Sequence, residues 1–251
     1  MNETQRIGII GGMGPMAGVL LQKLIIDATP AETDQDHLQV VCFTNPKIPD
    51  RTRSLTADGG KTYIAAIRDT AQALIKMGVT ILVIPCNTAH ARFEEIQNGL
   101  AVPIFNMVQA SVDYIAKKYG PRRRVGILVT DGLLEAKTYQ TALCEYNLNP
   151  IIPSPYHQQR LMRSIYNIKK GEQKSVLKEI QNAISELAGN GAETVLLGCT
   201  ELSLYFEQLQ KEQIPIEDPL RVAAQQLVES LTLSEESPSL MQVGGSTARL
   251  N

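Results

Sequence analysis

Long apolar runs, closely spaced cysteines and a strong excess of one charge are all missing from this sequence of 251 residues. Every apolar run is interrupted well before the roughly 20 residues that a membrane-spanning helix needs, so we expect no membrane partner. The formal net charge of -2 gives no basic surface of the kind that nucleic acid selects. A small molecule is the partner class that remains.

The four cysteines form no Cys-x-x-Cys pair, and only residues 1–5 precede the first strand-like run. Five residues are too few for a signal peptide, so we expect a cytoplasmic protein whose thiols stay reduced. Hydrophobic residues make up 43% and charged residues 20%, which suits a compact core. The length is compatible with one large α/β domain or with two smaller ones.

Short strand patterns alternate with amphipathic helical patterns along the chain. In the first half, strands are predicted over 6–10, 39–43 and 80–84, and helices over 16–28, 61–77 and 89–98. In the second half, strands are predicted over 124–128, 150–153 and 193–197, and helices over 134–146, 173–188 and 202–210. This alternation predicts an α/β fold in which parallel sheets are flanked by helices.

The two halves repeat one pattern. Arg6-Ile-Gly-Ile-Ile10 corresponds to Arg124-Val-Gly-Ile-Leu128, and the spacing from Gly78 to Cys86 equals that from Gly191 to Cys199. The repeat predicts two pseudo-symmetric lobes with the active site in the cleft between them.

We assign residues 1–106 and 214–231 to the first lobe and residues 107–213 to the second. Residues 218–231 have helical spacing and are expected to return to the first lobe. Residues 232–251, rich in Ser, Glu and Gly, are predicted to be a mobile tail.

Cys86 and Cys199 each lie between a predicted strand and the following helix. In parallel α/β sheets this edge forms the ligand crevice, and a helix N-terminus there is expected to lower the pKa of a thiol. Cys42, inside a strand, and Cys144, on a helix, are interpreted as buried packing residues. Plain burial is also the alternative for Cys86 and Cys199.

Facing lobes would bring the two sulfurs to opposite sides of one bound molecule. A thiolate on one face and a thiol on the other could remove a proton from a carbon and return one with inverted stereochemistry. Backbone N–H groups at the strand ends could bind a carboxylate and stabilise the charge that develops.

Five motifs in order carry a resemblance to a known family: Gly11-Gly-Met-Gly-Pro15, Asn45-Pro-Lys-Ile-Pro-Asp-Arg-Thr52, Pro85-Cys-Asn-Thr-Ala-His90, Ile165-Tyr-Asn-Ile-Lys169 and Gly198-Cys-Thr-Glu201. With them, nearly the whole chain resembles the aspartate/glutamate racemase superfamily, and most its aspartate racemase branch. The resemblance implies a homodimer without PLP, other cofactor or metal, in which Cys86 and Cys199 interconvert L- and D-aspartate or glutamate. It also implies that Cys86 deprotonates the D enantiomer and Cys199 the L enantiomer.

The resemblance further implies a set of substrate-binding residues. Arg51 would hold the side-chain carboxylate through its planar guanidinium, although a solvated arginine or a local pair with Asp50 is the alternative. Lys169 and Tyr166 would form a second carboxylate site. The remaining expected contacts are Met13 and Gly14 at the pocket floor, Asn87, Thr88 and Thr200 at the α-carboxylate and ammonium, Thr130 and Gly132 beside the substrate, and Glu201 beside the second thiol.

One stretch departs from the family pattern. Where relatives carry Thr-x-Gly-Thr followed by Ser-Gly, this chain has Thr130-Asp-Gly-Leu133 and then Ala136-Lys137. A pocket hydroxyl is therefore expected to be missing, and glutamate or another amino acid stays open beside aspartate.

Functions besides racemisation are also compatible with parts of the sequence. Gly12-x-Gly14-x-x-Ala17 matches a dinucleotide fingerprint, but Thr44-Asn45 stands where an acidic residue should hold ribose. Cys86, His90 and Cys199 have zinc-ligand chemistry, which a positive helix N-terminus opposes. A non-catalytic amino-acid-binding protein stays open as well, as does an isomerase or decarboxylase that acts on a dicarboxylate.

Overall fold

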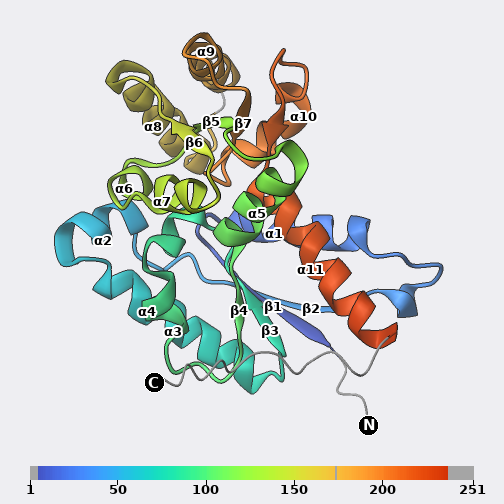
Figure 1. The fold of residues 1–251 in the computed structure, drawn as a ribbon. Coiled ribbons are helices and arrows are strands. Elements are labelled where there is room, and N and C mark those ends of the chain that lie inside the picture. Colours follow the sequence, from blue (N-terminus) through green and yellow to red (C-terminus); the bar gives the residue numbers. More distant parts are fainter. Residues whose placement is uncertain (1–4, 173, 237–251) are drawn as a thin grey trace, which may run out of the picture.

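The computed structural model describes residues 5–172 and 174–236, and in this part of the chain it contains two four-stranded parallel sheets, one in each lobe (Figure 1). The strand orders are β2-β1-β3-β4 and β6-β5-β7-β8, so the second half repeats the topology of the first. The first sheet consists of β1 (Arg6–Gly11), β2 (Gln39–Thr44), β3 (Ile81–Val83) and β4 (Ile104–Phe105). The second consists of β5 (Arg124–Ile127), β6 (Asn149–Ile151), β7 (Thr194–Leu196) and β8 (Ile216–Glu217). The predicted α/β fold with two lobes is confirmed.

Helices cover both faces of the first sheet. Its elements are α1 (Pro15–Ala28), η1 (Asp34–Asp36), α2 (Arg51–Asp58), α3 (Lys61–Lys76), η2 (Asn87–Arg92) and α4 (Phe93–Gln97). On one face Ile67 and Leu74 of α3 join Leu82 in a buried cluster, and on the other Leu21 of α1 packs with Ile9. This double burial explains why the strands read as continuous apolar runs.

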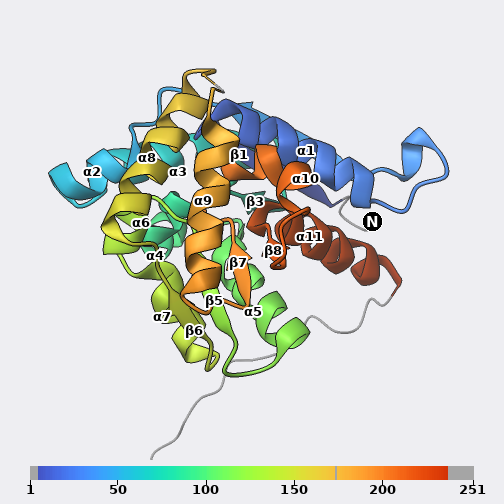
Figure 2. The same cartoon turned by 90° about the horizontal axis from the view of Figure 1, so that it is seen from above.

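The second sheet is covered in the same way. Its elements are α5 (Met107–Tyr119), α6 (Asp131–Glu135), α7 (Thr138–Glu145), α8 (Pro155–Lys169), α9 (Val176–Gly189), η3 (Leu202–Tyr205) and α10 (Phe206–Leu209). Helices α8 and α9 lie side by side on one face (Figure 2) and share a cluster that includes Leu161 and Ile184. On the other face α5 and α7 contribute Val112 and Leu143 to a separate cluster.

The last described helix, α11 (Pro219–Glu236), returns to the first lobe, where Leu220 and Leu227 pack with the cluster of α1. It lies against both α1 and α5 (Figures 1 and 2). Residues 214–231 were assigned to the first lobe, but β8, the strand just before α11, pairs with β7 in the second sheet. The second lobe therefore extends through 216–217, beyond the boundary predicted at 213, because this strand completes the repeated sheet.

Several helices differ from the prediction. The helices predicted over 89–98, 134–146 and 202–210 are each two shorter pieces; in the second of them, Lys137 has a left-handed backbone with φ 55°. Helix α2 was not predicted because its sequence carries one large apolar residue, Leu55, and therefore no amphipathic period. Cys144 is exposed, so its interpretation as a buried packing residue is wrong; it lies on the outer side of α7.

The first part of the predicted tail is helical. Helix α11 continues to Glu236 and so includes 232–236, whereas 237–251 lie outside the described residues. Gln173, the first residue of the helix predicted over 173–188, also lies outside them. Within 5–172 and 174–236, no helix has the length and apolarity needed to cross a membrane.

Candidate active site

A cavity of about 470 Å³ opens where the carboxyl ends of the strands of both lobes meet. Parallel α/β sheets bind ligands at this edge, because the loops that leave the strands converge there. The polar and glycine positions of its lining are Gly12, Gly14, Asp50, Arg51, Lys169, Gly171, Thr200 and Glu201. Loops of both lobes and the end of α8 thus build one site.

Cys86 and Cys199 lie at equivalent strand ends, and their side chains are nearly buried, with 5% and 4% exposed. The Thr200 hydroxyl donates a hydrogen bond of 3.2 Å to the carbonyl of Pro85, which joins the two cysteine loops directly. The cavity is lined by neighbours of Cys199, namely Thr200 and Glu201. Electrostatic interaction with both sulfurs raises the pKa of the Lys169 ammonium group.

The Cys199 thiol donates a hydrogen bond of 3.1 Å to Oε2 of Glu201. Burial raises the pKa of Cys199 well above the usual thiol value, and the negative charge of Glu201 raises it further. The expectation that a helix N-terminus would lower this pKa is therefore wrong. Desolvation and the adjacent carboxylate outweigh the effect of η3, a single short turn that begins only after Glu201.

The loop that carries Cys86 is held by a buried histidine. His90 Nδ1 lies 2.9 Å from the carbonyl oxygen of Cys86. Burial lowers the pKa of His90 to about 4, so the ring is neutral at pH 7 and Nδ1–H donates to that carbonyl. In the described part of the chain, no group of three or more His, Cys, Asp or Glu side chains is arranged to hold a metal ion, so Cys86, His90 and Cys199 do not assemble into a zinc site.

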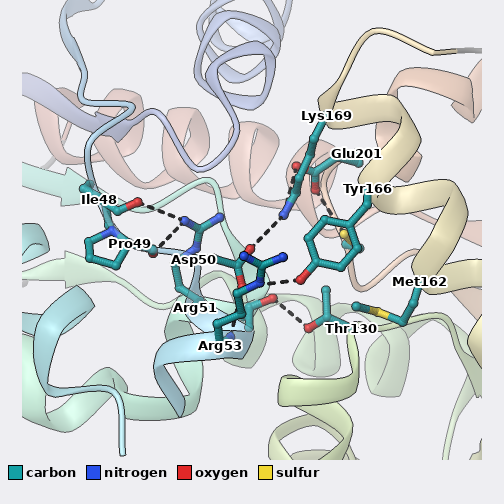
Figure 3. Close-up of polar contacts among 12 residues, drawn as sticks. Ile48, Pro49, Asp50, Arg51, Arg53, Thr130, Met162, Tyr166, Lys169 and Glu201 are labelled. Atoms are coloured by element: carbon teal, nitrogen blue, oxygen red, sulfur yellow. Dashed lines mark hydrogen bonds and ion pairs between the residues drawn. The ribbon is translucent and has the colours of Figure 1, made fainter. Parts of the chain in front are cut away.

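Arg51 is buried, with 7% exposed, and this contradicts the alternative of a solvated arginine. Its Nη1 donates to the carbonyl oxygens of Pro49 at 3.0 Å and Ile48 at 3.4 Å (Figure 3). Its Nε is buried and has no hydrogen-bond partner in the described part of the chain. The guanidinium is thus fixed by the backbone while part of its donor capacity stays unused.

Lys169 approaches carboxylates from both lobes. Its Nζ lies 3.8 Å from Oδ2 of Asp50 and 3.9 Å from Oε1 of Glu201 (Figure 3). Tyr166, one turn earlier in α8, directs its hydroxyl to Asp50 at 3.4 Å. The predicted Lys169 and Tyr166 pair therefore lies beside the cavity, with Asp50 as its partner in this structure.

The cavity lining holds two cations, Arg51 and Lys169, and two carboxylates, Asp50 and Glu201. Burial alone would lower the pKa of Arg51, but Cys86 and the two carboxylates raise it. Burial would also lower the pKa of Lys169, and Glu201 and Cys199 raise it. Both side chains therefore stay cationic although they are largely buried.

Other predicted site residues connect the lobes. The hydroxyls of Thr88 and Thr130 are 2.9 Å apart, and both line a small cavity beside the main one together with Arg51 and Lys169. Asn87 is buried, with 1% exposed, and its Oδ1 accepts a hydrogen bond from Tyr139.

Met13, Gly14 and Gly132 have different surroundings. The Met13 side chain belongs to the buried core, whereas Gly14 lines the cavity. A Cβ at Gly132 would lie 2.9 Å from Cα of Thr52, so this glycine lets α6 approach α2 closely. In the structure Gly132 therefore has a packing role between the lobes.

Two residues of the site were not proposed from the sequence. Asp50 was considered only as a local partner for Arg51, although its place in the Pro-Asp-Arg-Thr motif beside that residue was an available signal. Tyr139 lies 52 residues from Asn87, and no local pattern predicts their contact.

The fold and the site define a two-lobed α/β protein with paired buried thiols and a cleft between the lobes that is lined by cations and carboxylates. This chain belongs to the Asp/Glu/Hydantoin racemase family, whose model matches residues 10–227. The family predicted from the five motifs is confirmed.

Individual relatives match over most of the chain. The broad specificity amino-acid racemase RacX of Bacillus subtilis (strain 168) is 29% identical over 216 residues, which cover 84% of this chain and 92% of that protein. The structure of Picrophilus torridus aspartate racemase matches with a TM-score of 0.80 and 29% identity, over 91% of this chain and 94% of that one. An aspartate racemase homologue from Pyrococcus horikoshii OT3 has a TM-score of 0.72 at 23% identity, covering 91% and 99%, and shares the fold.

Proposed function

We propose that this protein is a PLP-independent amino-acid racemase of the aspartate type, in which Cys86 and Cys199 act on opposite faces of Cα. The observation that carries the proposal is the placement of two buried thiols at equivalent strand ends, whose loops are joined by the bond from Thr200 to Pro85. Lys169 Nζ lies 3.9 Å from Oε1 of Glu201, the residue that accepts the hydrogen bond of the Cys199 thiol. Family membership supports the same reaction.

The reaction is a transfer of one proton in and one proton out. One sulfur, as thiolate, takes the Cα proton, and the electron pair is delocalised toward the substrate carboxylate; the other sulfur, as thiol, returns a proton to the opposite face. Cys199 carries its proton and directs it to Glu201, so it is the acid in this state. Cys86 is then the base, and by the family resemblance it would act on the D enantiomer.

In the opposite direction Cys199 must act as thiolate and Cys86 as thiol. One turnover leaves the pair in this state, because Cys86 has taken the Cα proton and Cys199 has given its own proton to the substrate. Before turnover the Cys199 proton is held by Oε2 of Glu201, at 3.1 Å from the sulfur, and Lys169 lies next to Oε1 of the same carboxylate and balances its charge. Glu201 thereby keeps the second thiol in its protonated form until it delivers the proton.

Substrate carboxylates are bound by a cluster formed by the two cationic side chains of the cavity, Arg51 and Lys169. A carboxylate at Arg51 would use the buried Nε–H that has no hydrogen-bond partner among the described residues, and at Lys169 it would replace Asp50 and Glu201. Asn87, Thr88 and Thr200 would hold the α-carboxylate and ammonium, with Gly14 at the floor and Thr130 beside them. Aspartate or glutamate brings two carboxylates to this cluster.

The outer wall of the cavity is apolar and includes Met16, Pro46, Ile48, Ile168 and Leu204. Such a wall also accommodates side chains besides those of aspartate and glutamate, as the name of the B. subtilis relative suggests. The substrate test therefore uses a panel of amino acids.

We place the protein in the cytoplasm as a homodimer. All four cysteines are free, as a reducing compartment would keep them.

The proposal is tested by chiral chromatography after incubation with L- and D-amino acids, without PLP and with EDTA present. Wild-type protein should interconvert enantiomers, fastest for the acidic amino acids. Cys86→Ala and Cys199→Ala should each lower the rate by at least about 1,000-fold, because each removes the acid or base from one face.

Cys144→Ala is the matched control, since Cys144 is exposed on α7 away from the cavity. It should retain wild-type activity. Full turnover in Cys86→Ala or Cys199→Ala would reject the two-thiol scheme, and bound amino acid without any conversion by wild type would identify a binding protein instead.

A further inference from the structure

The loop that carries Cys86 receives a buried hydrogen bond from the opposite lobe. Tyr139 of α7 is fully buried, and its hydroxyl donates to Oδ1 of Asn87 over 2.6 Å. Asn87 directly follows Cys86 and is 1% exposed. A residue of the second lobe thus determines the position of a side chain next to a catalytic thiol of the first.

The direction of this bond orients the amide. An amide oxygen only accepts, and a tyrosine hydroxyl that keeps its proton can donate to it. Burial raises the pKa of Tyr139 far above its ordinary value, so the hydroxyl stays protonated at any working pH. The amide oxygen of Asn87 is therefore turned toward Tyr139 and its NH₂ group away from it.

The NH₂ group of Asn87 is unused. Its Nδ2 is buried and has no hydrogen-bond partner among residues 5–172 and 174–236. A buried donor without a partner is unfavourable, and proteins usually satisfy such groups with protein atoms, water or ligand. Beside Cys86 the ligand available to it is a substrate carboxylate.

We propose that Tyr139 is a positioning residue that holds the Asn87 amide, across the lobe boundary, with Nδ2 directed at the substrate carboxylate. The inference rests on the proposed function, because it assumes an amino acid bound beside Cys86. Tyr139 is suited to this role since its ring belongs to the buried core of the second lobe, together with Val112, Leu133 and Leu143.

Two further hydrogen bonds hold the same loop against the second lobe, one from Thr200 to Pro85 and one between Thr88 and Thr130. These bonds engage a backbone carbonyl and a hydroxyl, whereas the bond from Tyr139 determines which end of an amide faces the site. Loss of the Tyr139 hydroxyl should therefore impair substrate binding while the loop stays in place.

The kinetic test uses Tyr139→Phe, with Tyr146→Phe as matched control. Tyr146 directly follows helix α7, and its hydroxyl accepts a hydrogen bond of 2.9 Å from Nε2 of Gln109, so the control also loses one hydrogen bond, between two residues that do not line the cavity. We expect KM for D- and L-aspartate to rise about tenfold in Tyr139→Phe, with kcat changed less than about threefold, and both constants to stay at wild-type values in Tyr146→Phe.

A double-mutant cycle asks whether Tyr139 acts through Asn87. Asn87→Ala should raise KM at least as much as Tyr139→Phe, and the double variant should be no worse than Asn87→Ala alone. Independent, additive effects on KM would overturn the inference, as would an unchanged KM in Tyr139→Phe.

A second readout needs no turnover. In the NMR spectrum of protein with ¹⁵N-labelled asparagine, the side-chain NH₂ signal of Asn87 is assigned by its loss in Asn87→Asp. This signal should shift in Tyr139→Phe and not in Tyr146→Phe. If wild-type protein racemises no amino acid, the proposed function fails. The NMR signal still tests whether Tyr139 positions the Asn87 amide. An unshifted signal in Tyr139→Phe would overturn it.

Discussion

Arg51 shows how burial and backbone contacts prepare one side chain for an anion. The two carbonyls that accept from Nη1 hold one edge of the guanidinium, so the planar fork cannot turn freely. Its charge is retained despite burial because anionic groups surround it. Such a fixed guanidinium recognises a second carboxylate through geometry as well as charge, which a lysine ammonium cannot do.

Replacement of Arg51 should therefore change substrate preference. We expect Arg51→Ala to lower kcat/KM for aspartate and glutamate about 30-fold more than for alanine or serine, equivalent to roughly 2 kcal/mol for a hydrogen-bonded charge. Arg51→Lys should recover only part of this loss. Arg53→Ala, an exposed arginine of the same helix, serves as control in the same steady-state assay. Equal losses for every amino acid would show that Arg51 does not read the side chain.

At the scale of elements, α2 and α6 bring the lobes into contact through a glycine. A Cβ at Gly132 would lie 2.9 Å from the backbone of Thr52 and 3.0 Å from its hydroxyl, and neither backbone can move without shifting its helix. The departure from the family pattern at this point places Leu133 in the buried core of the second lobe. The segment thus contributes mainly to the fit between lobes.

Gly132→Ala should consequently lower the free energy of unfolding by about 1–3 kcal/mol, the usual cost of overpacking. Gly189→Ala is the control, because a Cβ at Gly189, at the end of α9, would meet nothing within 4 Å. That control should be neutral or stabilising by up to about 1 kcal/mol. Urea denaturation measures both, and an equal loss in the two variants would contradict the close approach of α6 to α2.

The elements that the sequence predicted well are those with a strong apolar period. Helix α3 and strand β2 were predicted within a residue of their bounds, because α3 shows its buried face in the sequence and β2 is a short, continuous apolar run between polar residues. Helix α2 shows no such face, and the breaks within 89–98 and 202–210 depend on tertiary contacts. A backbone turn such as that at Lys137 carries no strong local signal either.

At the scale of the whole molecule, the repeat in the sequence predicted the site because it predicted the symmetry. Equal spacing from glycine to cysteine placed both thiols at strand ends, and the repeated strand order puts them there. What the spacing could not predict were contacts between lobes, such as Lys169 with Asp50 or Tyr139 with Asn87. These depend on how the lobes face each other, which only tertiary structure determines.

The same scale explains why Cys86 and Cys199 should differ. Cys199 donates to Glu201, whereas Cys86 lies beside Arg51 and its loop is held by His90. The pseudo-symmetric fold therefore contains two chemically unequal thiols. Under the proposed function, this difference would let the free enzyme start with one thiol protonated and the other ionised, as acid and base.

The central claim is that one thiol serves each face of Cα, and exchange of the α-proton in D₂O, followed by NMR for each enantiomer, tests it most directly. Cys86→Ala and Cys199→Ala should each fail to racemise, yet each should exchange the α-proton of one enantiomer, and a different one in each variant. Exchange of the same enantiomer by both variants, or racemisation by either at the wild-type rate, would contradict the account.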